Sequence, residues 1–140
     1  MTREPAGSIW LPATPPPASH GRTWDLSEIA ELPQMRAELR ELLGTAAAAE
    51  LRDQLVLALD EMASNALRHG GGDVRAAVRR AESAWLLEVS DAAADQPPTP
   101  AVGRDPSEGG LGLYLIAELS SAHGWYVENG AKHVWAVLPA

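Results

Sequence analysis

Two polar residues in the middle of this sequence have the types and the spacing that could support chemistry. Glu61 and Asn65 are four residues apart, so on a helix their side chains lie on the same side. A carboxylate and an amide oxygen suit Mg²⁺, which usually takes one or two protein oxygens together with phosphate oxygens and water. Asn65 could therefore bind the ion, and Glu61 could act as a general base towards a water or hydroxyl group. A solvated polar stripe is the plainer interpretation of the same spacing.

A glycine-rich turn is the second candidate. It occupies four consecutive positions directly before an apolar helical pattern, namely Gly109, Gly110, Leu111 and Gly112. Three glycines here would let the backbone approach a phosphate and direct N–H groups towards it. A simple loop-to-helix turn has the same composition.

Asp91 and His69 complete the set of candidates. Asp91 follows the apolar run 85–89, where its carboxylate could accept a hydrogen bond from an exocyclic amine such as that of adenine, or could simply begin a turn. His69 lies one turn beyond Asn65, so it could face bound phosphates, although a histidine at a helix end also interacts favourably with the helix dipole.

Two helices must position the acid–amide pair. Helical spacing of leucines predicts one helix from Pro33 to Gly44 and a second over 47–69, ended by the glycines 70–72. Glu61 and Asn65 then fall at the rim of the apolar arc of the second helix. Residues 1–20 are rich in proline and predict a disordered or extended tail, in which Trp10 and Leu11 could be a docking spot. Residues 21–27 predict a weak edge strand.

The second half of the sequence is mostly strand. Strands are predicted over 73–81 and 85–89, followed by a long proline-rich loop over 92–108 and, after the glycine-rich turn, a helix that ends near residue 120. Two final strands, 124–128 and 133–138, are joined at Asn129-Gly130, a strong hairpin signal. Helices first and strands later favour an α+β fold, a two-layer sandwich in which one mixed, mostly antiparallel sheet carries helices on one face.

Composition excludes several classes of function. The chain has 140 residues, no cysteine, one lysine and a net charge of −8, so a disulfide scaffold and direct nucleic-acid binding are disfavoured. It contains no Gly-Lys-Ser/Thr triplet, which rules out a P-loop. Because it lacks a 20-residue apolar run and a secretory signal, we expect a cytoplasmic protein that does not enter a membrane.

The candidate groups occur in an order that resembles the GHKL ATP-binding superfamily. LDEMASNALRHG (59–70) resembles its N box, Val89-Ser90-Asp91 the start of its first glycine box, and Gly109–Leu113 its second. Within the superfamily the chain looks most like the anti-sigma factor serine/threonine kinases of bacterial partner-switching systems, and KHVWA (132–136) resembles the last strand of their single-domain actinobacterial members. The resemblance covers residues 21–140.

The resemblance implies a fold and a set of roles. The fold would be the Bergerat-type sandwich, with 92–108 as the ATP lid and 21–140 as one ATP-binding domain. Asn65 would bind Mg²⁺, Glu61 would be the catalytic acid/base, Asp91 would receive the adenine amine, and Gly110 and Gly112 would border the phosphates of ATP. The sequence departs from the family pattern Asp-x-Gly-x-Gly, since it reads Asp91-Ala92-Ala93-Ala94-Asp95 and Ala93 stands where the first glycine is usual.

A serine/threonine protein kinase that acts on a small antagonist protein is the leading hypothesis. By resemblance, its partners would be a sigma factor, an anti-anti-sigma protein of the STAS type, or both. The resemblance also suggests a homodimer, although the sequence does not settle the oligomeric state. Ala93 motivates an alternative in which the chain is a catalytically degenerate module that only binds partners. A free-standing ATPase subunit is a third reading of the same residues.

Overall fold

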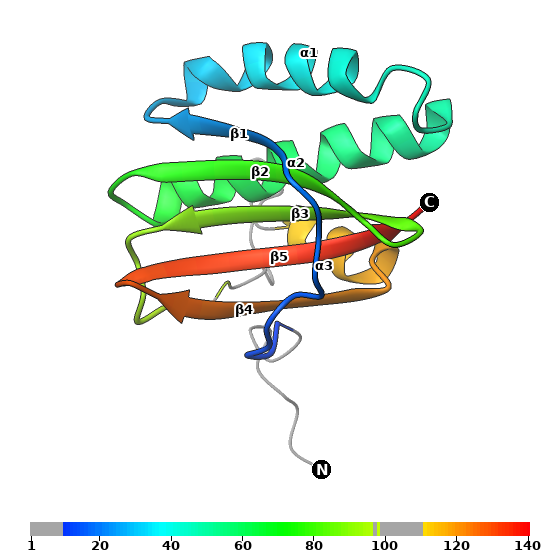
Figure 1. Ribbon diagram of the computed structural model, residues 1–140. Coiled ribbons are helices and arrows are strands. Elements are labelled where there is room, and N and C mark those ends of the chain that lie inside the picture. Colours follow the sequence, from blue (N-terminus) through cyan, green and yellow to red (C-terminus); the bar gives the residue numbers. More distant parts are fainter. Residues whose placement is uncertain (1–9, 97, 99–110) are drawn as a thin grey trace.

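The computed structural model describes residues 10–96, 98 and 111–140 (Figure 1). The strands are β1 (Gly21–Leu26), β2 (Val74–Ala81), β3 (Ala84–Asp91), β4 (Ala122–Glu128) and β5 (Ala131–Pro139). The helices are α1 (Leu32–Leu43), α2 (Ala49–His69) and α3 (Leu111–Leu119), and a 3₁₀ turn, η2 (Ile29–Glu31), precedes α1. The predicted helices and strands are therefore confirmed, with boundaries displaced by about two residues.

The five strands form one sheet in the order β1-β2-β3-β5-β4, and each neighbouring pair is antiparallel. A parallel contact occurs only outside these strands in the described part of the chain, as an isolated bridge between Pro12 and Trp125. In β3 and β5, Asp91 lies opposite Lys132 and Glu88 lies opposite Trp135. This register decides which polar side chains meet on each face of the sheet.

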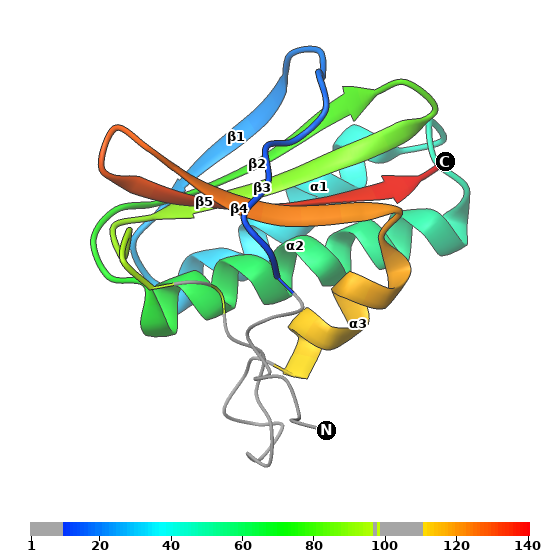
Figure 2. The ribbon, with the colours of Figure 1, turned by 90° about the horizontal axis from the view of Figure 1, so that it is seen from below.

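Three helices cover one face of the sheet, which confirms the predicted α+β sandwich (Figure 2). The core lies between the layers and includes Leu39 from α1, Leu59 from α2, Ile116 from α3 and Leu87 from β3. Helix α2 is 21 residues long and contacts β2, β3, α1 and α3, so it is the central support of the helix layer. The residues on its rim are thereby fixed relative to both the sheet and α3.

Local sequence explains where the elements turn. Proline in the first turn of α1 has no N–H to leave unpaired, and Gly44 ends the helix with a φ of 45°. The hairpin between β4 and β5 turns at Asn129 and Gly130, whose φ values are 53° and 76°. Two consecutive positive φ values are the mark of a type I′ turn, which accounts for the Asn-Gly pair.

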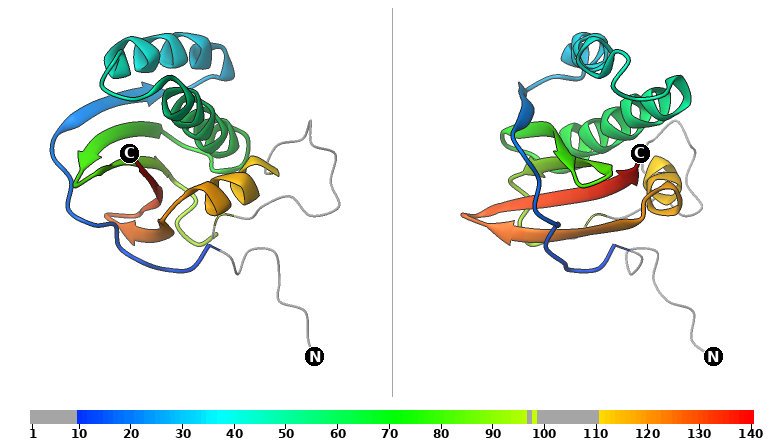
Figure 3. Two further views of the ribbon diagram at one scale, coloured as in Figure 1. Left: turned by 90° about the vertical axis from the view of Figure 1, so that its right-hand side faces the viewer. Right: turned by 45° about the vertical axis from the view of Figure 1, so that its right-hand side comes forward.

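Residues 10–20, the described part of the predicted tail, form a strap that runs from the core across the sheet. Trp10 is 1% exposed in the helix-side core, and the strap then passes the edge of β4, where Ala13 N–H donates to the Trp125 carbonyl at 2.9 Å. It crosses the face of the sheet opposite the helices and ends where Ser19 N–H donates to the Arg80 carbonyl at 2.8 Å (Figure 3). Proline enrichment predicted a chain without regular structure, but it did not reveal that Trp10 anchors this chain in the core.

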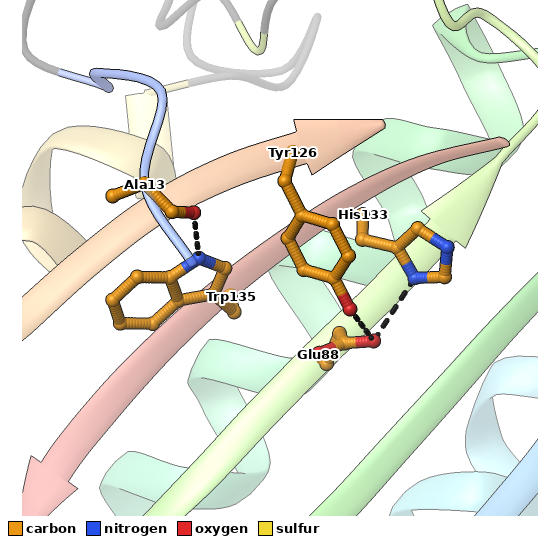
Figure 4. Close-up of polar contacts among 5 residues, drawn as sticks. All are labelled: Ala13, Glu88, Tyr126, His133 and Trp135. Carbon is orange, nitrogen blue, oxygen red and sulfur yellow. Dashed lines mark hydrogen bonds and ion pairs between the residues drawn. The ribbon is translucent and has the colours of Figure 1, made fainter. Parts of the chain in front are cut away.

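The strap covers only part of the open face. The Trp135 indole donates to the Ala13 carbonyl at 2.8 Å, and beside it the Tyr126 hydroxyl and the His133 ring converge on the Glu88 carboxylate (Figure 4). Tyr126 and His133 stack with ring centroids 4.6 Å apart. This polar cluster lies on the opposite side of the sheet from α2 and its candidate site residues.

Candidate functional site

Helix α2 carries three of the candidate residues in order towards its C-terminus. Glu61 and Asn65 are partly buried at the rim of the helix, as predicted, and His69 is exposed at its last residue. His69 makes no hydrogen bond or ion pair with any residue that the structure describes. Its neighbour in sequence, Gly70, adopts φ −82° and caps the helix.

Glu61 lies against the first turn of α3. A Cβ added at Gly112 would stand 2.7 Å from Glu61 Oε2 and 2.8 Å from its Cγ, so the absence of a side chain at position 112 leaves room for the carboxylate. Burial raises the pKa of Glu61 above its ordinary value, the nearby Asp60 charge raises it further, and Arg68 partly opposes both. Asp60 itself points to α1, where it accepts from Arg36 at 2.8 Å. A partly dehydrated carboxylate of this kind is a stronger base than a solvated one.

Asp91 lies at the other end of the site, on the helix face of the sheet. Its side chain is 3% exposed, and Oδ1 accepts a hydrogen bond from the Ala93 N–H at 2.8 Å. A Cβ at Gly70 would stand 2.4 Å from Asp91 Cγ, so this glycine permits the close approach of α2 to the end of β3. Lys132 reaches the same carboxylate, with Nζ 3.5 Å from Oδ2.

The two ends are held at a fixed spacing by α2. Glu61 and Gly70 are nine positions apart, which is about 13.5 Å along a helix axis. That length is comparable with an extended nucleoside triphosphate. Asn65 lies on α2 between these two ends.

A pocket of about 190 Å³ opens beside Glu61 on the side away from Asp91. Glu61 and Gly112 are among its lining residues, and the remaining walls are mostly apolar side chains of α2 and α3, namely Leu57, Ala58, Leu115, Ile116 and Leu119, together with Gln54. Leu57 and Leu115 are each about half exposed, so the pocket is open to an incoming group.

Not every predicted residue can be placed, because Gly109 and Gly110 lie outside the described residues. Leu111 and Gly112 were predicted in the turn before the helix, but they are the first two residues of α3. No group of three or more His, Cys, Asp or Glu side chains suited to a metal ion occurs among the residues described. Asn65 as a single protein ligand fits Mg²⁺ bound mainly through phosphates and water, rather than a metal held by protein alone.

The sequence did not predict that two charged residues of the sheet are buried. Lys132 is 6% exposed and Glu88 is 7% exposed, and both lie in strands composed mostly of apolar residues. Glu88 is the one acid in the otherwise apolar run 86–89. Because a buried charge requires a partner, this position could have indicated a buried polar contact in the sheet. The partners themselves depend on strand register, which the sequence alone does not supply.

A model of the histidine kinase-like ATPase domain matches residues 26–138. The chain belongs to this family. No curated protein matches the chain closely enough to count as a relative. No helix within the described ranges has the length and apolar character needed to cross a membrane.

Membership of the histidine kinase-like ATPase domain family accords with the geometry around α2. The N-box residues lie on α2, and Asp91 at the start of the first glycine box lies by the C-terminal end of that helix. Gly112, in the first turn of α3, packs on Glu61. Ala93 occupies the position of the missing glycine without a left-handed backbone, because Ser83 and Asn129 are the only non-glycine residues with positive φ in the part of the chain described. Its N–H still bonds to Asp91.

Proposed function

We propose that this ATPase-family domain binds magnesium–ATP and transfers the γ-phosphate to a serine or threonine hydroxyl of a small STAS-type antagonist protein. The observation that carries the proposal is the placement of Glu61, a partly buried base that lies beside Gly112 and lines an open pocket. A sigma factor sequestered by the same domain completes the proposed partner-switching role. The proposal places the protein in the cytoplasm.

Each residue has a distinct part in the proposed reaction. Asp91 accepts a hydrogen bond from the exocyclic amine of adenine, Asn65 would hold the Mg²⁺ that neutralises the phosphates, and Gly112 borders the phosphates at the start of α3. Glu61 takes the proton from the attacking hydroxyl as its oxygen bonds to the γ-phosphorus, while the bond to the β-phosphate oxygen breaks and ADP leaves.

The pocket beside Glu61 supports a protein acceptor over water alone. Its walls are mainly leucine and alanine side chains, which would pack against an acceptor segment and hold its hydroxyl at the carboxylate. Holding two reactants in this way accounts for much of the rate in phosphoryl transfer. A simple ATPase would have no use for an apolar surface at that position.

The test is phosphate transfer from γ-labelled ATP to purified STAS-domain proteins of the same organism. We expect wild type to label one of them on serine or threonine, Glu61→Gln to bind ATP without labelling, and Asn65→Ala to lose magnesium-dependent binding. Steady release of phosphate without any labelled protein would instead identify an ATPase.

One observation favours a second candidate, a domain of the same fold that acts only by binding partners. The methyl group of Ala93 stands where the family usually has glycine, next to the residue proposed to receive adenine. If wild type binds no ATP at millimolar concentration but still captures a sigma factor or STAS protein, this second candidate is correct.

A further inference from the structure

Lys132 is the only lysine in the chain, and it is buried. It belongs to β5, where alternation places its side chain on the helix face with Val134. Cross-strand register puts it directly opposite Asp91, and its Nζ lies 3.5 Å from Asp91 Oδ2. The side chains of the pair are 7% and 3% exposed.

The Lys132 ammonium group has more hydrogen-bond donors than it has acceptors among the residues described. A lysine carries three N–H donors, and among the residues described Lys132 has one polar partner, at a distance longer than a good hydrogen bond. Asp91 is better served, because its Oδ1 accepts from the Ala93 N–H at 2.8 Å. Buried charges normally have their hydrogen-bonding capacity filled, so at least one donor of Lys132 is available for an acceptor that enters the site.

The pair therefore presents an acceptor and a donor side by side. Adenine presents the complement on one edge, since its exocyclic amine donates and the ring nitrogens on either side of that amine accept. A carboxylate alone can read the amine, but it cannot distinguish a ring nitrogen from a C–H group.

We propose that Lys132 is a second base-reading residue, which donates a hydrogen bond to the ring nitrogen next to the amine received by Asp91. The inference rests on the proposed function, because it places adenine at Asp91. It adds a specificity-determining residue that the N box and glycine boxes do not contain. The competing account is that Lys132 only neutralises the Asp91 carboxylate.

The experiment is calorimetric titration of ATP, 1-deaza-ATP and 7-deaza-ATP, with Mg²⁺, into wild type and Lys132→Met. Each analogue replaces one ring nitrogen by C–H. A hydrogen bond from a charged donor predicts ATP binding about 10- to 100-fold weaker in the variant. On wild type, one of the two analogues should show a similar loss relative to ATP. In Lys132→Met that analogue and ATP should bind alike, which identifies the nitrogen that lysine reads.

Two controls keep the result specific. Arg40→Met removes one exposed positive charge from α1 and should leave ATP affinity unchanged. Thermal unfolding checks whether Lys132→Met folds, and if it does not, the wild-type comparison of the three nucleotides still decides, because equal affinities would overturn the proposal.

The outcomes separate this inference from the proposed function. Wild type that binds no ATP defeats both. Wild type that binds ATP, with Lys132→Met binding it equally or more tightly, defeats the inference alone. The same holds if the analogue penalty persists in Lys132→Met, since the ring nitrogen is then read by something other than the lysine.

Discussion

The contact between Gly112 and Glu61 makes Gly112→Ala a test of how the proposed base is positioned. The new Cβ would stand 2.7 Å from Oε2, 2.8 Å from Cγ and 2.9 Å from Cδ of Glu61. Three atoms of one side chain are too close, so the carboxylate must rotate away. The backbone need not move, because all three atoms belong to a side chain that can change rotamer.

The substitution should separate stability from catalysis. Alanine favours a helix over glycine by up to about 1 kcal/mol, so α3 should be no less stable in the variant. Displacement of a catalytic group by about 1 Å costs on the order of 100-fold in rate, or about 2.7 kcal/mol of activation free energy. We therefore expect phosphate transfer to a STAS-domain acceptor to fall about 100-fold, with the melting temperature unchanged or slightly raised.

A double-mutant cycle shows whether the effect passes through the carboxylate. Transfer is measured with γ-labelled ATP for wild type, Gly112→Ala, Glu61→Ala and the double variant. If alanine acts only by moving Glu61, it has no further effect once that side chain is absent. A further large loss in the double variant would refute the reasoning, as would full activity of Gly112→Ala.

Two other predictions concern buried groups. Trp10→Ala should lower the free energy of unfolding, measured by urea titration, by about 3 kcal/mol, because removal of a Trp that is 1% exposed leaves a cavity. The control Leu11→Ala should change it by less than about 0.5 kcal/mol because Leu11 is 60% exposed, and equal effects of the two variants would mean that Trp10 does not anchor the strap. Glu61→Gln should be more stable than wild type near pH 7 but not near pH 4, because the pKa of Glu61 is raised above 4.5 in the folded state, and wild type therefore loses stability as the pH rises from 4.5 through the folded-state pKa. A difference in the free energy of unfolding that does not change with pH would contradict the burial of this carboxylate.

Local patterns predicted the parts of the fold that local physics decides. Leucine spacing located α1 and α2, because each helix must bury one face. Asn129-Gly130 located the β4–β5 hairpin, because only residues that tolerate positive φ form its turn. The four-residue spacing of Glu61 and Asn65 placed both on one rim of α2.

Long-range pairing explains what the sequence did not reveal. Trp10 is buried beside His123, more than a hundred positions away in sequence, and nothing near Trp10 indicates that contact. Lys132 lies opposite Asp91 only because β3 and β5 pair in one register. A shift of one strand by one residue would place the two side chains on opposite faces of the sheet.

The position of Ala93 shows why a departure from a family motif must be judged by its conformation. Glycine is required where φ is positive or where a methyl group would collide with a neighbour. Ala93 does not adopt positive φ, and its N–H closes a short turn onto Asp91 Oδ1 at 2.8 Å. The backbone therefore keeps the Asp91 carboxylate oriented without a glycine, and what the methyl group can still affect is the space beside that carboxylate. Lys132 lies on β5, the strand paired with β3. In the proposed role it contacts one edge of the base from β5, and this contact does not require the turn after β3 to approach the base more closely.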